Sequence, residues 1–513
     1  MRRYGIFLII LLFAITACGA GSGSSSTGSS SGSVNISMSD APGDFDHVWI
    51  TVKSVWFHTS NAAGPDDAGW LKYDLSSPVS IDLESLSGKV SSQIWSGLTL
   101  PDGNYQQIRL FLVPTENALA QSASSQGLSY NNEAVVNGTA YPLRIPTPDK
   151  GIKLSGTFGV AASTPLNLAL EFDVSHDVIS FTRDSITEYV LKPDLQYFDL
   201  DNAAAIVGQL DPGAIANAPN ARFIIKAEQV DQAGDRFVIR RVAALQSNGS
   251  FILYPLWPGT YDVMIRGIGY DTAIVQNVPA VKGTTPASSP TNIGQCAMVN
   301  SPAPDFAVGG TVVPTGSWAD FEQTVPGMAT PYVVRYRHFN PFTGTFSNFL
   351  LSSGPLQVAP FNNGGNPAFA NTVPAEGTGN FQAVARAYLY DPSTAFIANA
   401  SSAEPLAFGT LAPASGTANQ VSGNLLFASN VSLFNGVTFV TQGGIIVNAL
   451  YTGAMSGSTW PYAVGDLPGN FAGARYHINA LAWNPGLYIG APSAFDLING
   501  TNASGVDVQM KAQ

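Results

Sequence analysis

Short apolar runs separated by turn-forming residues are the feature that most limits how this chain can fold. The run 48–57, Val-Trp-Ile-Thr-Val-Lys-Ser-Val-Trp-Phe, is rich in β-branched and aromatic residues, and it follows the turn-forming sequence Ser-Asp-Ala-Pro-Gly-Asp at 39–44. Runs of similar character recur at 108–112, 166–174 and 223–227. Such runs, bounded by Gly, Pro, Asn and Asp, are typical of β-strands joined by tight turns. The sequence therefore predicts a mainly β fold.

The composition agrees with this prediction and excludes one class of partner. Only 11% of the 513 residues are charged, whereas the chain contains 51 Gly and 34 Pro. A chain of this length has room for several domains, each with its own core. The net charge of −12 argues against nucleic acid as a partner, because binding phosphates requires concentrated Lys and Arg.

The first 18 residues carry a targeting signal. Arg2 and Arg3 precede the apolar segment Tyr4–Ile15, and Thr16-Ala17-Cys18 follows. A positive start, a short apolar core and small residues before the cut are typical of a secretory signal. With the cysteine, the segment resembles the bacterial lipoprotein signal. That resemblance implies removal of 1–17 and attachment of lipid, including palmitate, to Cys18. The alternative is an ordinary cleaved signal that happens to contain a cysteine.

The residues after the signal fit a tether to a membrane. Residues 18–33 comprise the cysteine and a Gly/Ser-rich stretch, which is expected to behave as a flexible coil. The stretch contains a Gly-x-Ser-x-Gly sequence at 28–32, but a hydrolase serine needs a strand-to-helix turn around it. We therefore expect a lipid anchor in a bacterial cell envelope. Gly19 stands where a retention aspartate would, which by resemblance favours the outer membrane if the host has one.

The first folded domain is predicted at 34–200. It contains one candidate short helix between Leu75 and Trp95, where Leu83, Leu86 and Val90 fall at helical spacings. Several short sequences in this region resemble, in order, the bacterial family called domain of unknown function 4382. The resemblance implies a secreted or lipid-anchored domain and no assigned activity. It is carried by Ser39–Pro42, strand residues at 50–55, Trp70, Pro101–Arg109, Tyr141–Pro146, Glu171–Asp173 and Tyr189–Pro193.

A second module is predicted at 204–283. Its strand start Gly249-Ser-Phe, the turn Pro258-Gly-Thr-Tyr and the pair Gly269-Tyr270 resemble the carboxypeptidase regulatory-like, or transthyretin-like, β-sandwich. Such modules act as spacers, and some relatives belong to carbohydrate-binding folds. We expect a positive φ at Gly259, which would make Gly259→Val costly.

The rest of the chain repeats this arrangement. A linker is predicted at 284–304, followed by β-sandwiches at 305–412 and 418–513. We expect tandem sandwiches of the Ig-like or transthyretin-like class, whose separate cores unfold separately. Similar sequences that would open a module recur at Val207–Leu210, Val308–Val312 and Val421–Leu425. A sequence similar to the turn at Trp257 occurs at Trp483–Tyr488.

The sequence holds no compact catalytic motif. The histidines at 47, 58, 176, 338 and 477 are scattered, and zinc-protease, Cys-x-x-Cys and Walker patterns do not occur. If Cys18 carries lipid, Cys296 has no partner for an intramolecular disulfide. A Ser-His-Asp triad assembled from distant segments stays open.

Two weaker binding sites are predicted. Asp40, Asp44 and Asp46 form an acidic cluster with oxygen ligands suited to Ca²⁺, although Asp residues also stabilise turns. No other cofactor is expected. The aromatic residues Trp257, Trp483 and Tyr488 could stack on a glycan, or could close the open end of a sandwich core.

Three functions follow. The leading hypothesis is a lipid-anchored, non-enzymatic envelope protein with a structural or adhesive role, held at the membrane by its lipid and contacting a glycan or another envelope protein. The alternatives are a carbohydrate-binding surface lipoprotein and a hydrolase whose site is assembled at a domain boundary.

Overall fold

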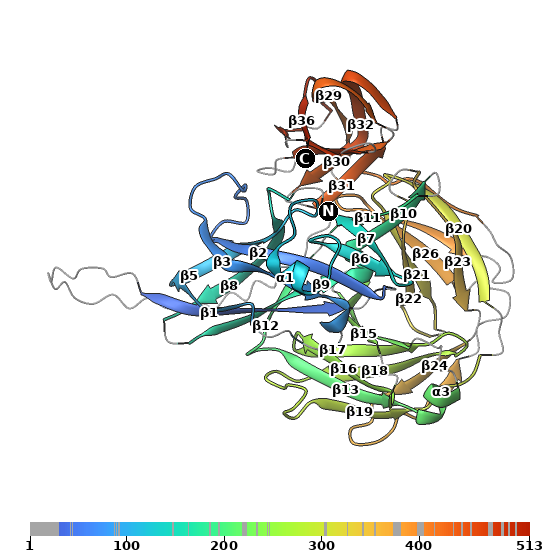
Figure 1. The fold of residues 1–513 in the computed structure, drawn as a ribbon. Helices are drawn as coiled ribbons and strands as arrows, with labels where there is room; N and C mark the ends of the chain where they lie inside the picture. The colour runs from blue at the N-terminus through green and yellow to red at the C-terminus, as the bar shows by residue number, and fades with distance from the viewer. Residues whose placement is uncertain are drawn as a thin grey trace, which may run out of the picture.

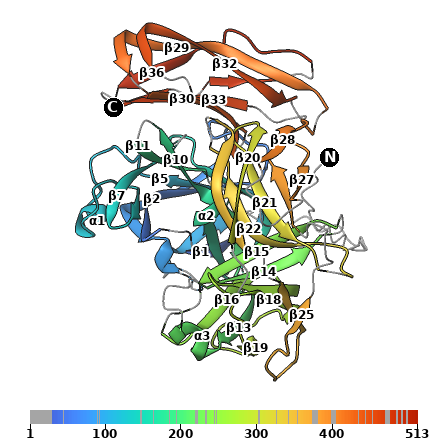
Figure 2. The same ribbon diagram turned by 90° about the vertical axis from the view of Figure 1, so that its right-hand side faces the viewer.

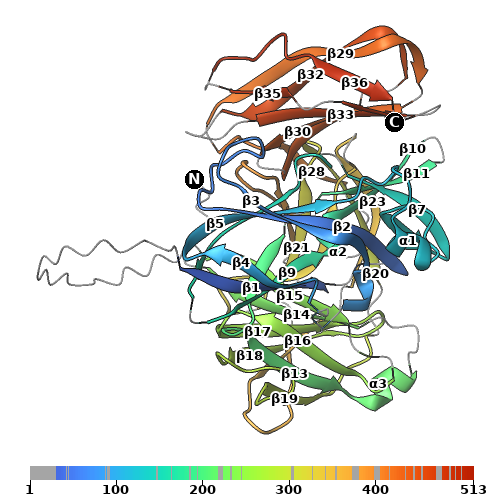
Figure 3. The ribbon, with the colours of Figure 1, turned by 60° about the vertical axis from the view of Figure 1, so that its left-hand side comes forward.

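The computed structural model describes residues 30–512 with internal gaps, of which the longest are 218–222, 373–380, 398–404 and 470–475. The fold is mainly β, as predicted. We name its parts domain 1 (31–200), module 2 (204–301), module 3 (305–412) and module 4 (418–512). Module 4 lies at the top of Figure 1 and module 2 at the bottom, with domain 1 and module 3 between them; the turned views in Figures 2 and 3 show the same order.

Domain 1 consists of two sheets around one apolar core. The sheet orders are β12-β9-β1-β4 and β10-β11-β7-β6-β2-β5-β8, with β3 also paired to β2. The strands are β1 Ser31–Ala41, β2 His47–His58, β3 Leu71–Asp82, β4 Trp95–Pro101, β5 Gly103–Leu112, β6 Glu133–Val136, β7 Thr139–Arg144, β8 Ile152–Val160, β9 Leu166–Asp173, β10 Val178–Arg183, β11 Ile186–Leu191 and β12 Gln196–Asp199. The helical turns are η1 Glu84–Leu86, α1 Gln121–Ser125 and α2 Val174–Asp177.

The helix predicted between Leu75 and Trp95 is wrong. Its first part belongs to strand β3, and only η1 is helical, as a single 3-10 turn. Pro78 and Gly88, the latter with a φ of 65°, lie inside the predicted helix and disfavour it. The helices of domain 1 form instead at α1 and α2, which are too short to show apolar periodicity.

The start of domain 1 also differs from the prediction. The tether was expected to extend to residue 33, but β1 begins at Ser31, and Ser31, Gly32 and Ser33 pair with β4. Backbone hydrogen bonds therefore order three residues whose composition is that of a flexible coil.

Modules 2, 3 and 4 share one topology. In each, the first strand pairs antiparallel with the fourth and parallel with the last. The predicted module openings lie on these first strands. Module 2 contains β13 Ala204–Leu210, α3 Pro212–Asn217, β14 Ile224–Val230, β15 Arg236–Ala243, β16 Ser250–Leu256, β17 Gly259–Arg266, β18 Thr272–Ala280 and β19 Thr291–Cys296.

Module 3 keeps this order and adds an insertion. Its sheets are β23-β20-β28 and β22-β21-β26-β27, while β24 and β25 join a sheet of module 2. The strands are β20 Asp305–Val313, β21 Trp318–Gln323, β22 Tyr332–His338, β23 Thr345–Ser352, β24 Leu356–Pro360, β25 Ala370–Thr372, β26 Phe381–Arg386, β27 Ser393–Ile397 and β28 Pro405–Thr410.

Module 4 forms one continuous sheet, because β34 pairs with β36 and joins the two halves. The strands are β29 Ala418–Leu433, β30 Asn435–Gln442, β31 Ile445–Tyr451, β32 Met455–Pro468, β33 Tyr476–Trp483, β34 Leu487–Gly490, β35 Ser493–Phe495 and β36 Val508–Ala512.

Two further expectations for this half need correction. The segment 284–304 is not a linker throughout, because β19 lies within it and pairs with β13. Gly259 does not have a positive φ; it begins strand β17 in ordinary strand geometry.

The cores are joined rather than separate. One apolar cluster combines Met264 and Ile274 of module 2 with residues of modules 3 and 4. A smaller cluster places Ile179 and Val190 of domain 1 against Phe439 of module 4. The expectation of fully separate cores therefore does not hold, because apolar faces of neighbouring modules pack against one another.

Candidate functional site: the polar hub on module 2

The outer face of one module 2 sheet contacts two other parts of the chain. On β14, Ile225 and Ala227 point into the core of module 2, so Lys226 and Glu228 point to the opposite face. In an isolated sandwich this face would meet water. Here it is covered by domain 1 and module 3. We call its charged residues, together with the groups that contact them, the polar hub. These residues are Lys226, Glu228, Arg236, Arg240 and Asp262.

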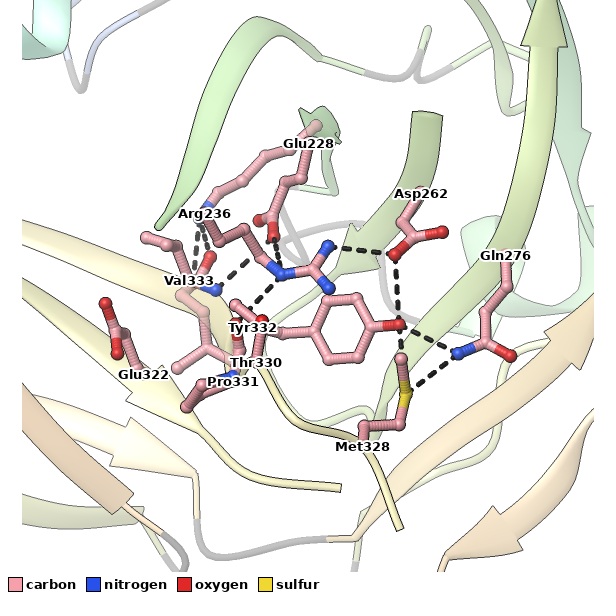
Figure 4. Close-up of polar contacts among 12 residues, drawn as sticks. Glu228, Arg236, Asp262, Gln276, Glu322, Met328, Thr330, Pro331, Tyr332 and Val333 are labelled. Atoms are coloured by element: carbon pink, nitrogen blue, oxygen red, sulfur yellow. Dashed lines mark hydrogen bonds and ion pairs between the residues drawn. The ribbon is translucent and has the colours of Figure 1, made fainter. Parts of the chain in front are cut away.

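Arg236 connects module 2 to module 3 (Figure 4). Its Nη1 donates to Oδ2 of Asp262 over 2.8 Å, and its Nε donates to the carbonyl oxygen of Pro331 over 2.9 Å. The guanidinium lies 3.9 Å from the ring centroid of Tyr332. The Tyr332 hydroxyl donates to Asp262 and accepts from Gln276 Nε2 over 2.8 Å. One buried cation therefore organises groups from both modules.

Lys226 and Glu228 bind the same segment of module 3. The Lys226 Nζ donates to the carbonyl oxygen of Val333 over 2.7 Å, and the Val333 amide donates to Glu228 Oε2 over 3.3 Å. Burial raises the pKa of Glu228 to about 7, against the opposing effect of Lys226 and Arg236. The interface thus contains a carboxyl group that titrates near neutral pH.

A second part of the hub joins module 2 to domain 1. The parallel pairing of β1 with β9 sets Ser39 beside Glu171. Arg240 is fully buried, forms an ion pair with Glu171, and donates from Nη2 to the carbonyl oxygen of Asp40 over 3.1 Å. The Ser39 hydroxyl also donates to Glu171, over 3.2 Å. Ser39 and Glu171 belong to two of the short sequences that resemble the family of domain 1. They are 132 residues apart in the chain and meet at one arginine of another module.

Burial controls the charge of this cluster. It raises the pKa of Asp40 well above its usual value, with the nearby Glu84 and Asp173 adding to the effect and Arg240 opposing it. Burial likewise raises the pKa of Glu171, and Arg240 again opposes the shift. Asp40 also caps a helical turn, because its Oδ1 accepts from the Val174 amide over 3.2 Å. Its role in the fold is therefore structural.

Domain 1 and module 3 meet beside α2. His176 Nδ1 lies 2.7 Å from Asp173 Oδ2, and His338 Nε2 donates to the His176 carbonyl oxygen over 2.7 Å. Ser175 is adjacent, but its hydroxyl donates to Asp173 Oδ1 over 2.8 Å. A hydrolase serine would instead bond to the imidazole that removes its proton. This Asp-His-Ser group has the residues of a triad in an arrangement that does not activate the serine.

Two of the three predicted calcium residues lie in the described part of the chain, in different surroundings. Asp40 is buried at the hub, whereas Asp46 is exposed and accepts from the Gly138 amide over 2.8 Å. Asp44 lies outside the described residues. Within the described part of the chain, no group of three or more His, Cys, Asp or Glu could hold a metal ion. Calcium binding stays a prediction.

The predicted glycan-stacking residues lie on two different modules. Trp257 is 37% exposed and packs on Phe198 of domain 1, with ring centroids 5.1 Å apart. Tyr488 contacts Phe427 edge to face at 5.3 Å within module 4. The Trp483 side chain lies outside the described part. Of the two members whose side chains the structure describes, Trp257 is exposed and Tyr488 is partly buried.

One of the two cysteines lies in the described part of the chain. Cys296 is buried in β19, and burial raises the pKa of its thiol to about 12. Cys18 lies outside the described residues. In the described ranges, no helix has the length and apolar character needed to cross a membrane.

Sequence reasoning missed the hub. Alternation along β14, β15 and β17 indicates a face exposed to water, and nothing local distinguishes a wet face from one covered by another domain. The available signal was the concentration of charge in a chain that is only 11% charged. It falls on Lys226, Glu228, Arg236, Arg240 and Asp262.

Comparison with known proteins gives little beyond domain 1. No curated protein matches. Among solved structures, the chain is similar to the shaft pilin SpaA from Lactobacillus rhamnosus GG, at 10% identity and a TM-score of 0.18, covering 41% of this chain and 98% of that one. It is also similar to a streptococcal ancillary pilin, at 10% identity and a TM-score of 0.14, covering 60% and 99%. The major pilin SpaD from Corynebacterium diphtheriae matches at 10% identity and 0.14, covering 62% and 99%. Scores this low assign neither a common fold nor a function.

The family comparison is more specific. Residues 31–193 match the family described as Domain of unknown function (DUF4382). The match begins at the first residue of β1 and ends beside Lys192, whose Nζ donates to the Gly316 carbonyl oxygen of module 3 over 2.7 Å. Within this chain the match covers domain 1, and the three modules after it lie outside the match.

Proposed function

We propose that this chain is a non-enzymatic structural or adhesive protein of a bacterial envelope, whose four domains act as one rigid body. The observation that carries the proposal is the polar hub, where charged side chains of module 2 are buried against domain 1 and module 3. Arg236 and Arg240 are at most 4% exposed, and each has partners from another domain.

Buried ion pairs resist separation of the domains. Removing one partner of such a pair leaves an uncompensated charge and costs about 3–5 kcal/mol. Interfaces inside a chain ordinarily permit relative domain motion unless they are large and apolar. The apolar clusters shared between modules provide such apolar contact in addition to the ion pairs. A stiff body suits a protein that displays or spaces a surface.

Small-angle X-ray scattering tests the rigidity. The chain from residue 19 onward should give a scattering profile that fits the compact arrangement, apart from its tether. A profile that requires separated, independently moving domains would contradict the proposal. The same sample should leave a panel of ester, peptide and glycoside substrates unreacted. Turnover abolished by Ser175→Ala or His176→Ala would favour the hydrolase alternative.

The lipid anchor rests on the sequence of the signal. We expect Cys18→Ser to release the protein from membranes into soluble extracts, because the attached lipid is its only strong anchor. Metabolic labelling with a fatty-acid analogue should mark the parent chain and not this variant. Retention of Cys18→Ser in the membrane fraction would refute the anchor.

Glycan binding is the second candidate function. It is favoured by the partly exposed ring of Trp257 at the junction of domain 1 and module 2. A glycan array should then show a signal that Trp257→Ala removes, while the exposed Phe396→Ala on module 3 leaves it unchanged.

A further inference from the structure

The chain enters and leaves domain 1 at the same end of one sheet. Strands β1 and β12 both pair with β9, β1 in parallel and β12 antiparallel, so β12 runs back toward the start of β1. Beyond β12, the Leu200 amide donates to the Asn167 carbonyl oxygen over 2.8 Å, and Asn167 is the register partner of Asn35 on β1. The exit of domain 1 therefore lies beside the first half of the strand to which the tether leads.

Module 2 is joined to domain 1 at this exit. The Gly283 amide donates to the carbonyl oxygen of Ala203 over 2.8 Å, three residues after Leu200. Val281 and Lys282 directly precede Gly283, and both are exposed, Val281 to 52%. An apolar and a cationic side chain thus lie next to the connection between the two domains.

Trp257 lies at the same place. Its ring packs on Phe198 of the last strand of domain 1 and is still 37% exposed. Gly259 pairs with Ala280, so Trp257 and Val281 stand at the same end of β17 and β18. We call Trp257, Val281 and Lys282 the tether-end surface.

The tether limits how far this surface can lie from a membrane. This step rests on the lipid anchor proposed above. Residues 18–29 precede Ser30, and a Gly/Ser coil of that length spans about 20 Å on average. Asn35, which is level with the exit of domain 1, is about 17 Å along the strand from Ser30. A body held this closely by a flexible tether can tilt until the tether-end surface reaches the bilayer.

The chemistry of the surface suits the boundary between headgroups and acyl chains. Tryptophan is enriched at that depth because its ring is apolar while its indole N–H can still donate to a polar group. Lys282 is the cation of the surface, and the exposed Asp102 and Asp201 lie beside β1, where Asp102 bonds to Ser30. The charge therefore gives no preference for anionic lipid, and a zwitterionic bilayer is the expected partner.

We propose that the tether-end surface rests on the membrane to which the tether leads, with the Trp257 ring at the boundary of the acyl chains. The lipid and this surface then hold the body at two points, which fixes the direction in which modules 3 and 4 are displayed. The same ring cannot also stack on a glycan, so the proposal competes with the second candidate function.

Quenching of tryptophan fluorescence by brominated lipid tests the contact. The chain from residue 18 onward with Cys296→Ala has Cys18 as its one thiol, which can be coupled to a maleimide phospholipid. The vesicles are phosphatidylcholine with or without bromine on the acyl chains. The coupled parent should be quenched by the brominated vesicles, and Trp257→Phe should lose most of that quenching. Trp49→Phe is the matched control, because Trp49 is partly buried in β2, which follows the other end of β1.

A second pair of variants tests the orientation without removing the reporter. Val281→Asp should reduce the quenching, because a carboxylate resists entry into the boundary region. Ile268→Asp should leave the quenching unchanged, since Ile268 is 60% exposed and follows the opposite end of β17.

The outcomes separate this contact from the anchor. An unquenched parent would overturn the proposal, as would equal quenching of the parent and Trp257→Phe, or an equal loss with Ile268→Asp and Val281→Asp. A glycan-array signal that Trp257→Phe removes, without quenching on vesicles, would assign the ring to a glycan instead. Because the coupling supplies the anchor chemically, none of these results depends on lipidation in the cell, which the labelling of Cys18→Ser tests separately.

Discussion

Arg240 is a fully buried cation whose main partner, Glu171, comes from another domain. Its strand position is one that would be solvated in an isolated sandwich. Burying a charge is costly unless it is paired, and for this reason the contact fixes which surfaces meet rather than adding much net stability. The charged residues of the hub therefore determine which surfaces of the domains pack against one another.

We expect Arg240→Met to destabilise the protein by about 3–5 kcal/mol, because Glu171 would be left buried without its cation. Adding Glu171→Leu should recover part of the loss, since the pair is then replaced by apolar groups. Denaturant unfolding measures both. Lys282→Met, on the exposed surface of module 2, is the matched control and should change little. A double variant no more stable than Arg240→Met would contradict the pairing argument.

The raised pKa of Glu228 predicts a dependence of stability on pH. Its folded value is about 7, against an ordinary 4.5. A raised pKa contributes stability that is complete below pH 4.5 and is lost as the pH rises through 7. The loss should reach up to about 3 kcal/mol at alkaline pH.

Glu228→Gln keeps the hydrogen bond to Val333 and removes the titration, so its unfolding free energy should fall less between pH 5 and 8 than that of the parent. Thermal unfolding at several pH values measures this difference. Parallel pH profiles for Glu228→Gln and the parent would refute the assignment.

At the scale of elements, the sequence predicts where the strands lie, but it does not predict which glycine needs a positive φ. The turn between β16 and β17 was expected to need a left-handed glycine at Gly259, but the left-handed φ of 74° occurs at Gly249, before β16. A Cβ at Gly249 would lie 3.0 Å from Leu210 Cβ. Gly249, and not Gly259, is therefore the position at which the backbone and its neighbours require glycine.

We expect Gly249→Val to destabilise module 2 by about 1–3 kcal/mol, because a β-branched residue resists positive φ. Gly259→Val should cost less, since its Cβ would meet only the end of the flexible Gln229 side chain, at 2.7 Å. Comparing the denaturant midpoints of the two variants checks the ranking. Equal losses, or the reverse order, would show that backbone strain does not decide the effect.

At the scale of the whole molecule, the modules share cores. The largest apolar cluster runs from module 2 through module 3 to module 4. A substitution that destabilises module 3 should therefore also destabilise modules 2 and 4, as it would not if the modules were independent domains.

We expect Phe321→Ala, in the centre of module 3, to cost about 3–5 kcal/mol and to increase amide hydrogen exchange in modules 2 and 4 as well. Mass spectrometry of exchanged peptides locates the effect. Phe396→Ala removes the same side chain from the surface of module 3, where it is 72% exposed, and should alter little. Exchange that rises in module 3 alone would mean that the modules unfold separately.

The sequence alone determined the β class and the positions of the repeated module openings on first strands, because alternation and turn chemistry are local properties. The predicted signal and tether also rest on local sequence, and they stay predictions. The strand β19 in the expected linker was missed because Pro and Ser in its flanks dominate the composition there.

Tertiary structure alone decided the polar hub and the pairing of β24 and β25 with a sheet of module 2. A face that carries Lys226, Glu228 and Arg240 has the same alternation whether water or another domain covers it. The segment 356–372 has the sequence of an ordinary loop and short strands, and the strand edge with which it pairs lies in a different module. Burial and pairing between distant segments depend on how whole domains pack, which no local pattern encodes.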